Sequence, residues 1–253
     1  MFNLNSVGIV TARDNLTIHW SPDEVWTTVL NFSKMDKELA RQAYNLGKDA
    51  KDWKVELAQK DLIESGLDKR KIIPILYRPF DIRYAYYTGK SRGFICRPRP
   101  EVMQHMLAGR NLALVFVRQI KAFPSWHHCF VSKLIIESCL ISNSTSEISY
   151  IAPLYIYPEK KRGDLYNDPH LLESQANLKP GLLAALEKAY KRSLTPEQIF
   201  QYIYAVLYAP TYRERYIGLL RLGFPRIPFA AEWRVFKALT GLGERLVGLH
   251  LLC

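Results

Sequence analysis

The apolar residues change from a strand-like to a helical pattern along this chain of 253 residues, and this change constrains the fold more than any other feature. From Thr195-Pro196-Glu197-Gln198, which has the form of a capping box, they recur at helical spacing. Before that point, runs of β-branched and aromatic residues predict strands at 72–77, 82–87, 94–96, 112–117, 128–132, 134–141 and 150–157. The predicted class is therefore α+β, with a mixed β-sheet core of about five to seven strands, flanking helices and a C-terminal helical subdomain.

Capping residues and helix breakers predict where the helices begin and end. Ser21 before Pro22 predicts one N-terminus, Ser33 with Asp36 predicts the next, and Gly66 ends a third helix that starts near Asp52. A short helix is expected between residues 100 and 109. Later helices are predicted at 196–208, 211–222, 230–239 and 243–252.

These patterns divide the chain into three predicted segments. Residues 1–68 form an N-terminal linker with helices, residues 69–158 form the mixed-sheet core, and residues 159–253 form the helical subdomain. The last segment opens with a polar linker. No internal repeat is visible.

The positive charge of the chain is concentrated in the middle segment. The formal net charge is +11, and residues 69–121 alone hold 12 basic and 2 acidic residues, a net of +10. Residues 1–68 have a net charge of −3, and residues 122–253 have +4. Such a concentrated field attracts a polyanion. On composition alone, a solvated basic surface without a partner is the alternative.

Arginine and aromatic residues are interleaved within this basic stretch. Arginine can donate two hydrogen bonds to a phosphate or to guanine, and aromatic rings offer flat surfaces on which bases stack. The arginines are Arg78, Arg83, Arg92, Arg97, Arg99, Arg110 and Arg118, and the aromatic residues are Tyr77, Phe80, Tyr84, Tyr86, Tyr87 and Phe94. The combination indicates nucleic-acid binding.

The residues themselves predict no catalytic site and no metal site. The chain has no Asn/Asp/Ser-Pro-Pro-aromatic loop, no Gly-rich phosphate loop and no G-x-S-x-G nucleophile motif. Pro22-Asp23 and Asp49-Ala50-Lys51 have the letters of a nuclease motif, but the first pair opens a helix. His127 and His128 are neighbours on a predicted strand, so their side chains point to opposite faces and are poorly placed to chelate one zinc ion.

A cytoplasmic, reduced location is expected. The longest unbroken apolar run is LALVFV at 112–117, far shorter than the roughly 20 residues that span a bilayer. The first residues lack the basic and apolar regions of a signal peptide. Four cysteines in 253 residues are too few for a disulfide framework.

Several ordered blocks of the sequence point to one known family. The most specific is YRPFDIRY at 77–84, which fits a YRPFD-x-R signature. Further blocks are GIVTARD at 8–14, residues 98–107, 111–118, 152–155 and 203–213, FPRIP at 224–228, and residues 249–252. Together they resemble the C-terminal specificity region of Type ISP restriction–modification enzymes and their Type IIG relatives.

This resemblance implies a target recognition domain of an adenine-specific DNA methyltransferase and restriction endonuclease. It implies double-stranded DNA and the methyltransferase domain of the parent polypeptide as partners, no membrane, and a prokaryotic cytoplasm. S-adenosylmethionine, Mg²⁺ and ATP would serve upstream domains that this chain lacks, so no cofactor is expected here. The chain would be a natural fragment or a separately made piece.

The leading hypothesis is sequence-specific recognition of duplex DNA, in which basic residues contact phosphates and other side chains enter the major groove. For Arg78 and Arg83, an internal pair with Asp81 is the alternative. An RNA-binding module, or a non-catalytic assembly domain that docks an acidic partner, are the alternative functions. The candidate DNA contacts are Arg92, Arg97 and Arg99 around the turn at 88–93, Gln119 and Lys121 after a buried strand, Asn143 and Ser144 in a polar loop, and Arg78 and Arg83.

Overall fold

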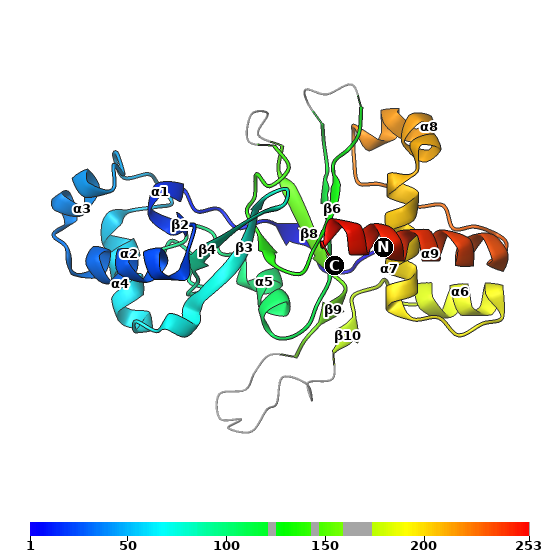
Figure 1. The fold of residues 1–253 in the computed structure, drawn as a ribbon, viewed down its shortest axis with the longest axis horizontal. Helices are drawn as coiled ribbons and strands as arrows, with labels where there is room; N and C mark the ends of the chain where they lie inside the picture. Colours follow the sequence, from blue (N-terminus) through cyan, green and yellow to red (C-terminus); the bar gives the residue numbers. More distant parts are fainter. Residues whose placement is uncertain (121–124, 143–146, 159–173, 253) are drawn as a thin grey trace.

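The computed structural model describes residues 1–120, 125–142, 147–158 and 174–252. The molecule is elongated, with helices α1–α4 at one end, the strands in the middle and helices α6–α9 at the other end (Figure 1). The predicted α+β class is confirmed, and the order of elements follows the change of pattern along the sequence.

Two of the N-terminal helices begin close to their predicted capping residues, although Ser33 lies inside the first of them and not at the start of the second. The Ser21 hydroxyl accepts the backbone N–H of Glu24, and the Glu24 carboxylate accepts that of Ser21, which closes a capping box. Asp36 caps the next helix through two backbone N–H groups. The third helix starts at Val55 and not near Asp52. The helices are α1 (Asp14–Thr17), α2 (Pro22–Lys34), α3 (Lys37–Ala43) and α4 (Val55–Ser65), followed by a 3₁₀ turn at Lys69–Lys71.

The described strands form three sheets, so the prediction of one mixed sheet is wrong. The first sheet is antiparallel in the order β1-β8-β5-β6, made of β1 (Ser6–Val7), β8 (Ser149–Pro153), β5 (Ala113–Val117) and β6 (Cys129–Ser132). The second is mixed in the order β2-β4-β3-β7, made of β2 (Ile18–His19), β4 (Asp81–Tyr86), β3 (Ile72–Arg78) and β7 (Ile135–Ile136), with β7 parallel to β3. A small pair joins β9 (Tyr155–Ile156) to β10 (Gln175–Ala176).

The division into separate sheets follows from the two faces of β5. All five of its residues are buried. On one face, Ala113 and Val115 pack with Ile75 and Ala85 of the second sheet and with α5 (Pro100–Leu107). On the other face, Leu114 and Phe116 pack against the C-terminal helices. Side chains alternate between faces in a strand, so β5 is apolar throughout because it separates two cores.

Residues 94–96 do not form the predicted strand. Phe94, Ile95 and Cys96 are buried, but they lie in a chain segment that makes one isolated bridge, between Arg97 and Val10. Apolar runs this short do not distinguish a strand from a buried turn. In this case the side chains complete the cores on either side of the turn.

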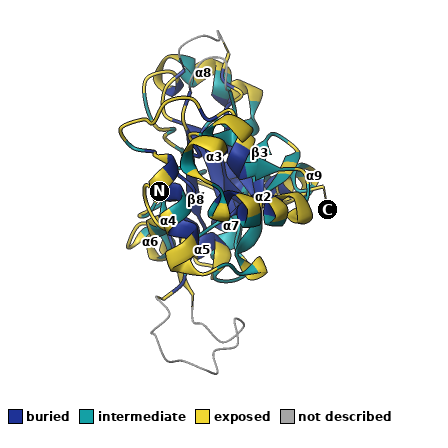
Figure 2. Cartoon of the chain, turned by 90° about the vertical axis from the view of Figure 1, so that its left-hand side faces the viewer, coloured by how far each residue is buried: buried dark blue, intermediate teal, exposed yellow. Residues whose placement is uncertain are grey.

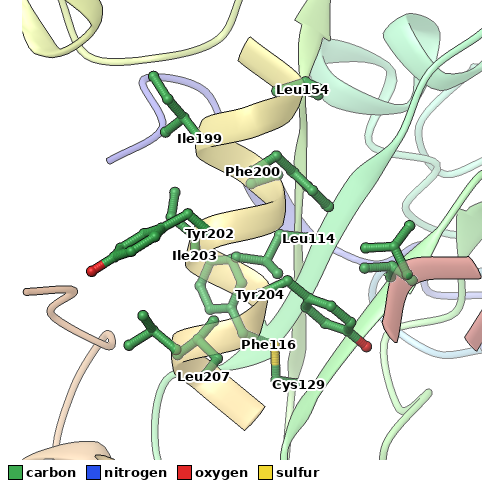
Figure 3. Packing of buried hydrophobic residues seen from close by; sticks show 14 of the residues in the cluster. Leu114, Phe116, Cys129, Leu154, Ile199, Phe200, Tyr202, Ile203, Tyr204 and Leu207 are labelled. Atoms are coloured by element: carbon green, nitrogen blue, oxygen red, sulfur yellow. The ribbon is translucent and has the colours of Figure 1, made fainter. Parts of the chain in front are cut away.

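The C-terminal part is built around one enclosed helix. Its helices are α6 (Leu182–Tyr190), α7 (Pro196–Tyr208), α8 (Pro210–Leu220) and α9 (Trp233–His250). Figure 3 shows α7 lying along the sheet, with Phe200 and Tyr204 next to Leu114 and Phe116. In Figure 2, β8 is buried in the interior, whereas α2, α3 and α5 carry exposed residues on their outer surfaces.

The predicted pair of helices at 230–239 and 243–252 is a single helix, α9. The expected gap at 240–242 does not occur, and Gly241 and Gly243 are both helical. At Gly243 an added Cβ would lie 1.9 Å from the backbone oxygen of Gln201 in α7. The glycine is therefore explained by close contact between two helix backbones. Within the described part of the chain, no helix is both long enough and apolar enough to cross a membrane.

Candidate nucleic-acid interface

Three of the predicted arginines surround one polar cavity. Arg92, Arg97 and Arg99 line a space of about 310 Å³, together with Asp52, Ser91, Cys96 and Glu101. The side chains of Arg92 and Arg97 are 64% and 50% exposed. The structure thus brings these three candidates together on an accessible surface.

Asp52 is the acidic partner of two of these arginines. Arg97 donates a short hydrogen bond to one carboxylate oxygen of Asp52, and the other oxygen lies 3.9 Å from Nη2 of Arg92. The hydrogen bond from Arg97 lowers the pKa of the Asp52 carboxyl, and the positive charge of Arg92 adds to this effect. Asp52 lies in the segment before α4. This helix was predicted to start near Asp52, but it starts at Val55.

A buried carboxylate holds the turn that carries Arg92. Asp61 of α4 is fully buried, and its Oδ2 accepts the Thr88 hydroxyl at 2.7 Å and the Phe94 backbone N–H at 2.8 Å. Gly93 is required here, because an added Cβ would lie 2.2 Å from that same oxygen. The hydrogen bonds of Asp61 therefore attach this turn to α4. Sequence reasoning missed Asp61 because an acidic residue on a helix is usually exposed.

Arg78 and Arg83 lie on the hairpin formed by β3 and β4, and both have acidic partners. Arg83 donates to both oxygens of Asp81, at 2.6 and 2.9 Å, and its guanidinium lies over the ring of Trp20. This is the internal Arg–Asp pair that the sequence left open. Arg78 pairs instead with Glu137, at 2.7 Å. Their contact with DNA stays a prediction.

Gln119 lies at one end of the first sheet. Val117 at the end of β5 pairs with Ser149 at the start of β8, and Phe116 pairs with Cys129 of β6. The described residues next to these strand ends, 118–120, 125–128 and 147–148, therefore lie at the same end of the sheet. Arg118 and Gln119 are exposed there. The other candidates, Lys121, Asn143 and Ser144, lie outside the described residues.

Arg213 of α8 lies beside this end of the sheet and was not among the sequence candidates. Its Nη1 is 3.0 Å from Nδ1 of His127, and its guanidinium lies 4.4 Å from the ring centre of Tyr208. Arg213, His127 and Trp126 border a cavity of about 480 Å³. The only sequence signal was the modest basic excess of residues 122–253.

The histidines do not form a metal site with other ligands. His128 is buried and lies 3.1 Å from a carboxylate oxygen of Glu147, while His127 faces Arg213. Burial lowers the pKa of His128. Among the described residues, no three His, Cys, Asp or Glu side chains gather as metal ligands.

Comparison with known proteins gives one family and several solved structures. The family described as the Type ISP C-terminal specificity domain matches residues 1–253. The chain is similar to one in the cryo-EM structure of a DrdV–DNA complex, with 27% identity over 98% of this chain and a TM-score of 0.71. No curated protein matches.

Two further structures share the fold. One is a nuclease-deletion mutant of the Type ISP restriction–modification enzyme LlaGI with a DNA substrate mimic, at 18% identity, 99% coverage of this chain and a TM-score of 0.64. The other is the ATP-dependent Type ISP enzyme LlaBIII bound to DNA, at 18% identity, 99% coverage and a TM-score of 0.67. The chain spans 23%, 22% and 16% of the DrdV, LlaGI and LlaBIII chains.

Proposed function

Because the chain belongs to the Type ISP C-terminal specificity domain family, we propose that it recognises a specific sequence in duplex DNA as the target recognition domain of a restriction–modification enzyme. The family match over residues 1–253 is the observation that carries this proposal. The chain of the DrdV–DNA complex, which is 27% identical over nearly the whole chain, supports it.

In this proposal two surfaces contribute different kinds of contact. The arginines around the cavity with Asp52 bind phosphate oxygens, because guanidinium groups match phosphate geometry and give affinity independent of sequence. Side chains at the end of the first sheet, with Gln119 among them, read base edges in the major groove. Glutamine and asparagine can form two hydrogen bonds with adenine, and that pairing gives sequence information.

The partners and cofactors of the whole enzyme belong to the proposal as well. We assign N6-adenine methylation and DNA cleavage to other domains of the parent polypeptide, in a prokaryotic cytoplasm. S-adenosylmethionine, Mg²⁺ and ATP are assigned to those domains, since the described residues of this chain offer no metal-ligand cluster and the sequence has no phosphate loop. The role of this chain is then to set the register of the duplex against the methyltransferase domain.

The experiment that tests the proposal is selection from randomised duplex DNA at two salt concentrations, with sequencing of the retained fraction. Enrichment of a short motif is the expected result. Binding that falls with salt but enriches no motif would assign specificity to the domain together with its methyltransferase partner. Absence of duplex binding at both salt concentrations would contradict the proposal.

Single-stranded RNA serves as the competitor in the same experiment. An RNA-binding module would stack unpaired bases on its aromatic residues and bind the RNA more tightly than the duplex. An assembly domain that docks an acidic protein would bind neither nucleic acid at modest salt. The proposed function requires the duplex to compete best.

A further inference from the structure

We propose that the cavity between Arg92, Arg97 and Arg99 is a phosphate-binding site, in which the carboxylate of Asp52 occupies the position of a DNA phosphate while no DNA is bound. The site is proposed as part of the DNA-recognition function above and deepens it. Asp52 thereby becomes a residue that weakens binding to the phosphate backbone, which is the part of the contact that carries no sequence information.

The first argument is the geometry of the charges. Arg92 and Arg97 converge on one carboxylate, one guanidinium on each of its oxygens. A phosphate offers the same feature, two negative oxygens that accept from guanidinium groups. The cavity of about 310 Å³ next to this carboxylate is lined mainly by polar atoms. It is accessible to solvent, because Arg92 and Arg97 at its edge are exposed. A phosphate at this point would compete directly with Asp52.

The second argument is an unsatisfied donor on a residue that lines the same cavity. Nε of Arg99 is buried and has no hydrogen-bond partner in the structure. A buried donor of this kind costs free energy until an acceptor meets it. Asp52 engages the other two arginines, and the Glu101 carboxylate accepts instead from the Ser6 hydroxyl at 3.3 Å. Neither carboxylate of the cavity therefore satisfies Arg99.

The third argument is the backbone of the segment. Arg92 and Arg99 both have positive φ angles, 60° and 54°, in the left-handed region that side chains other than glycine rarely adopt. Hydrogen bonds hold both residues: the backbone N–H of Arg92 donates to the carbonyl of Cys96, Asp61 anchors the turn on both sides, and the carbonyl of Arg99 accepts the Met103 backbone N–H of α5. Strained residues held in place by their surroundings are found at binding sites more often than elsewhere. The arginines are thus presented by a rigid support.

The physical consequence is an exchange of anions. When a phosphate enters, the guanidinium groups keep a negative partner, and the protein loses only the ion pairs with Asp52. The favourable free energy of binding any phosphate is reduced by the free energy needed to displace the Asp52 carboxylate. Binding to every duplex is therefore weakened by a similar amount, and the contacts to base edges supply a larger share of the total affinity for the target.

The test compares Asp52→Asn with wild type, using two probes on the whole chain. One probe is inorganic phosphate, followed through the Arg Nε–Hε signals in nitrogen-15 NMR spectra. The other is a random duplex, followed by fluorescence anisotropy. The variant is expected to bind both probes about two- to fivefold more tightly, the range of one exposed ion pair. The matched control is Glu56→Gln, which removes one exposed carboxylate of α4 whose neighbour is Lys37.

The outcomes separate the site from the function. Equal phosphate binding by Asp52→Asn and Glu56→Gln overturns the site, while duplex binding by the wild type would leave the proposed function standing. A gain for phosphate without any duplex binding by the wild type would keep the site and contradict the function. Two further variants control for the fold: Asp52→Glu is expected to bind like wild type, and Arg97→Ala is expected to abolish the gain from Asp52→Asn.

Discussion

Nη1 of Arg78 lies 2.7 Å from Oε2 of Glu137, and this ion pair joins the hairpin of the second sheet to the segment that leads into the first. Glu137 is buried, and its carboxylate also accepts the Ser138 hydroxyl and the Cys139 backbone N–H. Arg78 therefore acts first as the counter-charge of a buried group, whatever it contributes to DNA binding.

Arg78→Ala is expected to lower the free energy of unfolding by about 2–3 kcal/mol, because it leaves the Glu137 carboxylate buried without its cation. Urea denaturation followed by circular dichroism measures the change. Arg70→Ala is the control: Arg70 pairs with Asp68 but is 91% exposed, so a change within about 0.5 kcal/mol is expected. Equal effects of the two substitutions would show that the Arg78 pair is no more than a surface contact.

Gly243→Ala and Gly241→Ala are expected to have opposite effects, although both replace a glycine in α9. At Gly243 the new methyl group would meet the backbone of α7, and pushing the two helices apart costs about 1–3 kcal/mol. At Gly241 nothing lies within 4 Å, so alanine stabilises the helix by about 0.5–1 kcal/mol. Thermal denaturation of both variants measures the difference. A stabilised Gly243→Ala variant would contradict the close contact between α7 and α9.

Tyr77→Phe is expected to change how stability depends on pH in alkaline solution. The Tyr77 hydroxyl donates to Asp14 at 2.6 Å, and burial together with this carboxylate raises its pKa to about 12. Because the folded-state pKa lies above the ordinary value of 10.0, the unfolded state loses its proton first. The stability from this group is therefore fully present below about pH 10 and is lost as the pH rises to about 12.

The measurement is the difference in unfolding free energy between wild type and Tyr77→Phe across this pH range. Phenylalanine has no proton to lose, so the subtraction removes the contributions of the other tyrosines. The advantage of the wild type should shrink steadily from pH 10 upward. A constant difference would mean that the hydroxyl of Tyr77 titrates at its ordinary value.

Gln119→Ala is expected to reduce discrimination between the target duplex and random duplex while leaving random binding unchanged. A side chain that reads a base contributes to the specific complex alone, at about 1–3 kcal/mol for a two-bond contact. Dissociation constants for both duplexes, measured at one salt concentration, give the ratio. Gln104→Ala on the exposed side of α5 is the control, and it should leave both constants unchanged. Loss of affinity for both duplexes in Gln119→Ala would place this residue on the phosphate backbone instead.

Local signals in the sequence were sufficient for the fold class and for the start of the helix after Ser21. Ser21 caps its helix as predicted, and Asp36, but not Ser33, caps the next, since a cap depends on residues that are neighbours along the chain. The number of sheets could not be predicted in this way. The run at 112–117 is apolar whether a strand lies inside one large sheet or between two cores, and only the packing of Ile75 and Leu114 on opposite sides distinguishes these cases.

The candidate site was predictable as a set of arginines, but its organisation was not. Arg92, Arg97 and Arg99 are close in sequence, so their proximity in space required little long-range information. Asp52 lies 45 positions before Arg97 and Asp61 lies 33 positions before Phe94, and nothing in their local sequence marks them as partners of this turn. Gly243 illustrates the same limit, because its neighbour is the backbone of a different helix.

The pairing of β1 with β8 bears on the order in which a newly synthesised chain can fold. Ser6 pairs with Ile151, and the Asn177 side chain forms hydrogen bonds with the backbone of Leu4. The first residues therefore cannot form these contacts until the ribosome has synthesised residues near 151 and 177. The helices α2 and α4 find their contacts within one short stretch and can assemble while synthesis continues. At about 5–20 residues per second, β1 stays without its partner strand for roughly 7–30 seconds on the ribosome. We expect the N-terminal helices to form before the central sheet closes.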